Sequence, residues 1–117
     1  MSILANVLVA FVALLHVLFL VLEMFLWTKP FGRKTFGLTK ELAEASAKLA
    51  ANQGLYNGFL AAGLIWGIAA NLFEVKVFFL VCVIVAGVFG AFTAKRSILF
   101  VQALPGALAL AALMLAR

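Results

Sequence analysis

Residues 3–27 read ILANVLVAFVALLHVLFLVLEMFLW, an apolar run interrupted only by Asn6, His16 and Glu23. A helix needs roughly 20 apolar residues to cross a hydrocarbon core about 30 Å thick, so this run is long enough to span a membrane. It lacks the basic start, the short apolar core and the small-residue cleavage site of a secretory signal peptide. We therefore expect a retained transmembrane helix over 3–27, with Trp27 at the membrane–water boundary.

The rest of the chain shares this apolar character. Of its 117 residues, 68% are hydrophobic and 11% are charged, whereas soluble domains contain about 45–50% apolar residues. The single cysteine, Cys82, lies in an apolar run, so we expect neither an intrachain disulfide nor a metal site. Most of the basic residues behind the net charge of +5 lie in loops, which indicates membrane topology rather than nucleic-acid binding. These features predict one all-α integral membrane domain over 1–117, without a cofactor.

Three further segments complete a predicted four-helix bundle. Thr39 suits the N-cap of a long helix over 40–72, whose first turns we expect to stand out of the bilayer. The segment 76–94 is rich in β-branched residues, but a lone strand cannot close in lipid, so it is predicted to be a helix. The last span is 97–116, which contains Gln102 and Pro105.

Basic residues are distributed unevenly among the connections. The segment 28–40 is predicted to be a basic loop that contains the turn residues proline and glycine. Its phenylalanines would suit contact with anionic lipid headgroups. The alternative is a basic cytoplasmic loop that follows the positive-inside rule without contacting lipid. Seven basic residues fall on one side and two on the other: Lys29, Arg33, Lys34, Lys40, Lys48, Lys95 and Arg96 against Lys76 and Arg117. The positive-inside rule then predicts both termini outside and 28–40 in the cytoplasm.

A polar, glycine-flanked run, NQGLYNG at 52–58, lies in the first membrane turns of the second predicted helix. Polar side chains in hydrocarbon are costly unless they find partners, so this cluster is a candidate site. Counted inwards from the cytoplasmic boundary, Glu23, Asn52 and Gln102 all lie roughly 6–8 Å deep. We therefore expect a polar layer at one level of the inner leaflet.

Glu23 shares a helical stripe with His16, Leu20 and Trp27. A Glu23 facing inward would carry a proton or bind a cation; the alternative is an interfacial carboxylate that reaches water or pairs with Lys29. His16 is either a packed, hydrogen-bonded residue or a ligand. Asn6 lies on another face near the outside end, and we assign it no site role.

Glycines line one face of the second helix. Gly54 with Gly58, and Gly63 with Gly67, match the small-xxx-small spacing that lets membrane helices approach closely. Packing within the chain is the simplest interpretation, and contact with a second copy of the chain is also open.

Several of these residues together resemble the bacterial small membrane proteins grouped as domain of unknown function 1304. The resemblance covers essentially the whole chain and rests on Glu23 to Trp27, Lys29-Pro30-Phe31, Asn52 to Ala61, and Gln102 with Pro105. The resemblance implies a four-helix protein of the bacterial inner (plasma) membrane. It does not indicate any particular activity.

Three functions fit the predicted layer. The first is binding or transport of a small ligand, proton or cation. The glutamate in the first helix is similar to that of the small multidrug resistance transporters. The strong bias of basic residues to one side and the polar run 52–58 differ from those transporters. The second is an intramembrane acid–base enzyme on a lipophilic substrate, similar in outline to sterol isomerases. The third is structural assembly. The candidate ligand-binding residues are Glu23, Asn52, Gln53, Tyr56, Asn57, His16, Trp27 and Gln102, with membrane lipids as further partners.

Overall fold

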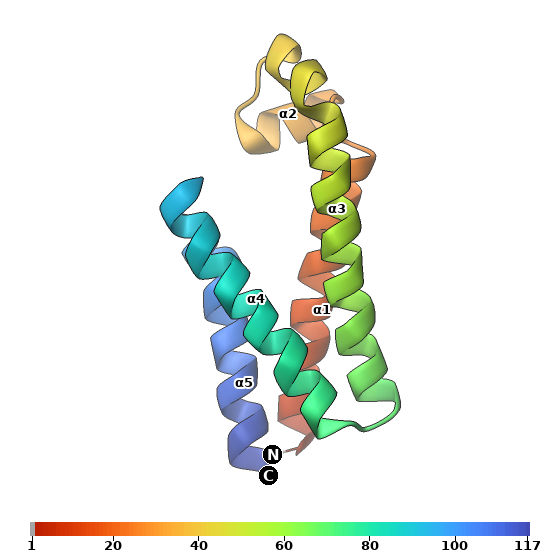
Figure 1. The fold of residues 1–117 in the computed structure, drawn as a ribbon, viewed down its shortest axis with the longest axis vertical. Helices are drawn as coiled ribbons and strands as arrows, with labels where there is room; N and C mark the ends of the chain where they lie inside the picture. The colour runs from red at the N-terminus through yellow and green to blue at the C-terminus, as the bar shows by residue number, and fades with distance from the viewer. Residues whose placement is uncertain (1) are drawn as a thin grey trace. The chain divides into compact units, whose positions relative to one another are not determined.

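A computed structural model describes residues 2–117, and no strand occurs in that range. The elements follow in the order α1 (Ser2–Met24), α2 (Pro30–Phe36), α3 (Lys40–Ala69), α4 (Phe73–Thr93), the π-helical turn η1 (Leu99–Ala103) and α5 (Leu104–Ala116) (Figure 1). The all-α prediction is confirmed. The long helices lie close to their predicted ranges, although α1 ends before Trp27 and α4 begins before residue 76.

Three helical segments of the described chain are long and apolar enough to cross a membrane: Ser2–Met24, Phe73–Thr93 and Leu99–Ala116. Only 22% to 33% of each segment is buried within the protein, so most of its apolar surface faces outward, as suits contact with lipid. Helix α3 is not among them. Its polar run at 52–58 and its charged first turns make it less apolar than the other three.

The chain forms two compact units. One contains residues 2–15 and 60–117, and the other contains residues 16–59. Helices α1 and α3 therefore each contribute one part to each unit.

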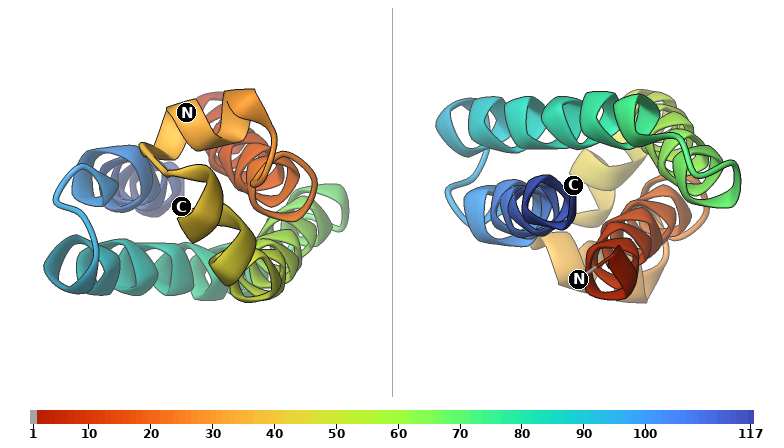
Figure 2. Two further views of the ribbon diagram at one scale, coloured as in Figure 1. Left: turned by 90° about the horizontal axis from the view of Figure 1, so that it is seen from above. Right: turned by 90° about the horizontal axis from the view of Figure 1, so that it is seen from below.

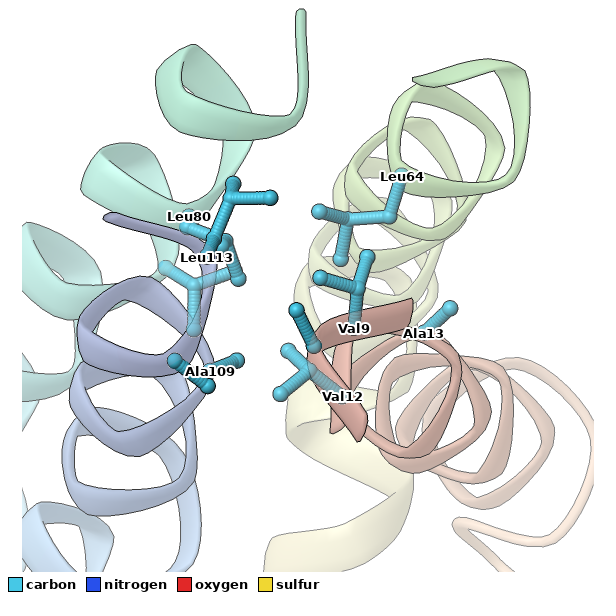
Figure 3. Packing of buried hydrophobic residues seen from close by; sticks show 10 residues of the cluster. Val9, Val12, Ala13, Leu64, Leu80, Ala109 and Leu113 are labelled. Carbon is cyan, nitrogen blue, oxygen red and sulfur yellow. The ribbon is translucent and has the colours of Figure 1, made fainter. Parts of the chain in front are cut away.

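The first unit has an apolar core to which α1, α3, α4 and α5 all contribute. Side chains such as Val9, Leu64, Leu80 and Leu113 point toward one another there (Figure 3). Several core positions are alanines, and small residues let membrane helices gain van der Waals contact at short range. Helices α4 and α5 lie side by side in both views of Figure 2.

The predicted loop 28–40 contains a helix, α2, that the sequence reading did not anticipate. Pro30 occupies its first turn, where the fixed φ suits a helix and the missing N–H is not needed. Gly37 ends the helix in the left-handed region, at φ 66°. The backbone N–H groups of Gly37 and Leu38 donate to the carbonyls of Lys34 and Arg33, which closes a Schellman motif.

Both ends of α3 are capped by local chemistry. At its start, the Leu42 N–H donates to Thr39 Oγ1 at 3.1 Å, so the predicted N-cap is confirmed. At its end, Asn71 takes the left-handed conformation at φ 52°, which asparagine tolerates better than most residues. The Leu72 N–H donates to the Gly67 carbonyl at 2.9 Å, again as in a Schellman motif.

The last predicted span is not a uniform α-helix. Its first part is the turn η1, and the Leu104 N–H donates to the Leu99 carbonyl five residues back. Pro105 follows directly and has no N–H to donate to Val101, which favours a local departure from α-geometry. Gln102 therefore lies in a π-helical turn rather than in a regular helix.

Candidate functional site

The central contact of the second unit joins α1 to α3. Asn57 Nδ2 donates a hydrogen bond to Glu23 Oε1 at 2.5 Å. Both side chains are partly buried. A carboxylate that accepts a hydrogen bond from an amide inside a helical protein is held in one orientation. Its other oxygen can still accept further hydrogen bonds. Glu23 and Asn57 thus form the core of the candidate site, which we call the Glu23–Asn57 pair.

Two glycines of α3 bring the pair together. A Cβ on Gly54 would lie 2.6 Å from Met24 Cγ and 3.1 Å from Glu23 Cβ, and one on Gly58 would lie 2.7 Å from Leu20 Cδ1. At Gly54 only a residue without a side chain allows α3 to approach α1 this closely, whereas at Gly58 the contact is with the end of a flexible side chain. The packing interpretation of Gly54 and Gly58 is therefore confirmed.

Helix geometry explains which polar residue reaches Glu23. At about 100° per residue, Asn57 lies about 60° from Gly54 around α3, whereas Asn52 and Tyr56 lie about 160° away. Because the Gly54 face packs on α1, Asn52, Gln53 and Tyr56 are exposed. Tyr56 lies beside Phe59, with ring centroids 6.0 Å apart. The structure thus brings Asn57, and none of these three residues, to Glu23.

The partner of Glu23 in the described residues is an amide rather than a lysine or arginine. In the part of the chain that the structure describes, no lysine or arginine forms an ion pair with Glu23, so the alternative pairing with Lys29 is not formed. An acidic side chain within a membrane segment ordinarily finds a partner or marks a functional site. The amide of Asn57 supplies a hydrogen bond but no positive charge.

His16 and Trp27, the other members of the predicted stripe, have different surroundings. His16 is fully buried and meets Phe19 in an edge-on arrangement, with ring centroids 5.2 Å apart. Trp27 lies beyond the end of α1, where its Nε1 donates to Ser46 Oγ at 3.0 Å and its ring lies 4.9 Å from that of Phe36. Trp27 therefore ties the turn after α1 to α3. Sequence reasoning did not identify Ser46, because only the fold brings it to Trp27.

Gln102 is partly buried in η1 and belongs to the first compact unit. Among residues 2–117, no group of three or more histidine, cysteine, aspartate or glutamate side chains forms a cluster able to hold a metal ion.

A family model described as "Protein of unknown function (DUF1304)" matches residues 10–114. The chain belongs to this family. The resemblance read from the sequence is thereby confirmed, and the matched range includes both members of the Glu23–Asn57 pair.

A curated relative aligns with nearly the whole chain. The uncharacterized protein YpaA of Lactococcus lactis subsp. lactis (strain IL1403) is 32% identical to this DUF1304 chain over 117 residues. The alignment covers 97% of this chain and 96% of YpaA. No solved structure matches the chain.

Proposed function

We propose that this DUF1304 chain is a four-helix membrane protein that binds a small cation at the Glu23–Asn57 pair and carries it across the bilayer. Three apolar segments supply three crossings, and the C-terminal part of α3 supplies the fourth. The chain acts as one domain in the bacterial inner membrane. The uneven distribution of basic residues supports termini outside and the segment 28–40 in the cytoplasm.

One observation carries this proposal: the carboxylate of Glu23 is oriented by Asn57 and has no ion-pair partner within residues 2–117. A partly buried carboxylate is more stable with a positive charge beside it than alone. A cation that donates hydrogen bonds, such as an ammonium or guanidinium group, would use the acceptor capacity that Asn57 leaves free.

A structural role is the second candidate, and the exposed polar face of α3 favours it. Asn52, Gln53 and Tyr56 are uncovered in the single chain. Polar side chains at membrane depth prefer a partner to lipid. A second copy of the chain, or another membrane protein, would cover this face.

The experiment is a binding measurement in nanodiscs of zwitterionic lipid. Sodium, ammonium, tetramethylammonium and guanidinium ions are titrated calorimetrically into the wild type and into Glu23→Gln. Glu44→Gln is the matched control, because it makes the same change of charge at an exposed glutamate in the first turns of α3. We expect at least one of these cations to bind the wild type and Glu44→Gln equally, and Glu23→Gln at least about tenfold more weakly.

The same proteins in liposomes separate binding from transport. If the wild type takes up the bound cation and Glu23→Gln does not, the protein is a transporter. Binding without uptake supports a receptor or sensor. If none of the cations binds, or if all three proteins bind alike, the cation site is refuted. Covalent crosslinking between copies through Gln53→Cys would then favour the structural candidate.

A further inference from the structure

The first unit holds a buried lysine. Lys76, in the first turns of α4, is only 4% exposed. Its Nζ donates a hydrogen bond to Asn6 Oδ1 of α1 at 3.0 Å. Sequence reasoning counted Lys76 as a loop charge and set Asn6 aside, yet the fold joins the two residues across 70 positions of the chain.

Lys76 has no negative partner in the described part of the chain. Glu74 is the nearest acidic residue in sequence, but it is exposed and lies about 200° away around the helix. No ion pair with Lys76 forms among residues 2–117. Burying an ammonium group away from water is costly unless an opposite charge or several acceptors compensate it. One amide oxygen is incomplete compensation for a group with three donors.

A cavity of about 140 Å³ opens beside this lysine. Its polar lining is rich in donors: the lining includes Lys76, Arg117, Asn6, Asn71 and Ser2. The Arg117 guanidinium lies 4.3 Å from the centroid of the Phe73 ring, which also lines the cavity, so a cation–π contact holds it there. Two cationic side chains therefore line one cavity whose lining has no aspartate or glutamate side chain, and the main-chain carboxylate of Arg117 is a counter-charge at the same residue.

The local sequence builds this cavity. Gly67 of α3 packs against Lys76, since a Cβ on Gly67 would lie 2.6 Å from Lys76 Cγ and 3.2 Å from its backbone nitrogen. The left-handed Asn71 ends α3 and turns the chain into α4, and Asn71 itself lines the cavity. The stem of Lys76 is thus held against α3, and its amine donates to Asn6, which lines the same cavity.

We propose that this cavity binds a phosphate oxyanion, with Lys76 and Arg117 as the charged ligands and Asn6, Asn71 and Ser2 as further polar contacts. Arginine and lysine are the side chains that most often bind phosphate in proteins. The volume is well below the roughly 300–1,000 Å³ of pockets for drug-sized ligands, so it suits a single small group. The group is either free phosphate or the headgroup phosphate of an anionic lipid. The site shares no residue with the Glu23–Asn57 pair and does not depend on the proposed cation binding.

The test uses the full chain in nanodiscs and two probes. Inorganic phosphate is titrated into protein in phosphatidylcholine discs, and native mass spectrometry counts phosphatidylglycerol retained from mixed phosphatidylglycerol–phosphatidylcholine discs. Lys76→Met keeps the apolar stem and removes the charge. Lys95→Met makes the same change at an exposed lysine after α4 and is the matched control. Arg117→Gln, at an exposed position, is a second variant that spares the buried core.

We expect the wild type and Lys95→Met to behave alike, Lys76→Met to bind at least about tenfold more weakly, and Arg117→Gln to be weakened in the same direction. Phosphate binding in phosphatidylcholine discs identifies a free anion, and selective retention of phosphatidylglycerol identifies a lipid headgroup. If neither probe binds, or if Lys76→Met matches the wild type, the proposal is overturned. Should Lys76→Met fail to fold, an unchanged affinity in Arg117→Gln overturns it instead.

Discussion

The side-chain amide of Asn57 donates to the carboxylate of Glu23, which joins α3 to α1 across 34 positions of sequence. This contact is both a structural link between two helices and the most specific polar feature of the second unit. Substitutions around it separate these two roles.

Replacing Asn57 with alanine should weaken the fold modestly. Interhelical hydrogen bonds in membrane proteins contribute about 0.6 kcal/mol on average and up to about 1.7 kcal/mol. We expect the loss for Asn57→Ala to fall near the upper value, because Glu23 would be left partly buried without its donor. Unfolding in mixed micelles measures this free energy. Asn52→Ala, on the exposed face of the same helix, should change it by less than about 0.5 kcal/mol. Equal losses in the two variants would show that the hydrogen bond is not the cause.

The two glycines should respond differently to alanine. At Gly54 a new Cβ meets Met24 Cγ and the Cβ of Glu23, so the helices must separate, at a cost of about 1–3 kcal/mol. At Gly58 it meets only Leu20 Cδ1, the end of a flexible side chain, and the gain in helix propensity of about 1 kcal/mol offsets that contact. Thermal unfolding in detergent should therefore show a lower midpoint for Gly54→Ala than for Gly58→Ala. The reverse order would contradict the packing described for α1 and α3.

The N-cap of α3 gives a third comparison. Thr39→Ala removes the oxygen that accepts from the Leu42 N–H, and we expect a loss of about 1 kcal/mol in the free energy of unfolding. Thr35→Ala is the control, because Thr35 Oγ1 donates to the Phe31 carbonyl within an exposed helix and caps nothing. A stability for Thr39→Ala equal to that of Thr35→Ala would argue against the cap.

Membrane topology can be tested with single cysteines on a Cys82→Ser background. We expect Lys34→Cys in α2 to be shielded from an impermeant maleimide in intact cells, and Ala70→Cys, between α3 and α4, to be labelled. The reason is the positive-inside bias, which places the basic segment in the cytoplasm. Permeabilised cells, in which both positions should react, provide the control. If Lys34→Cys alone is labelled in intact cells, the orientation is the opposite of the one predicted here.

The sequence was sufficient for the features that depend on local chemistry. Thr39 predicts the start of α3, because N-capping depends on the residue type at one position. The spacing of Gly54 and Gly58 likewise predicts a packed helix face, because close helix approach depends on small residues at that spacing. The apolar runs likewise predict the three segments that are able to span a membrane.

Features that depend on helix rotation or on distant contacts were harder to read. The sequence analysis groups Asn52 and Tyr56 with Glu23 as candidate ligand-binding residues, whereas the Gly54 face of α3 packs on α1 and brings Asn57 to Glu23. The glycines and the proline of α2 predict a loop from sequence alone, because they are turn residues, although proline at the first turn and glycine after the last one are also helix boundary signals. Nothing in the sequence joins Asn6 to Lys76, since the contact spans 70 positions, about three fifths of the chain.

The most direct test of the proposed site is infrared difference spectroscopy of the protein in nanodiscs, recorded with and without a bound cation. We expect the cation to perturb a carboxylate stretching band in the wild type and in Glu44→Gln, and this change to be absent in Glu23→Gln. That result would place the cation at the carboxylate that Asn57 orients. A cation-induced carboxylate signal that persists in Glu23→Gln would contradict the central claim.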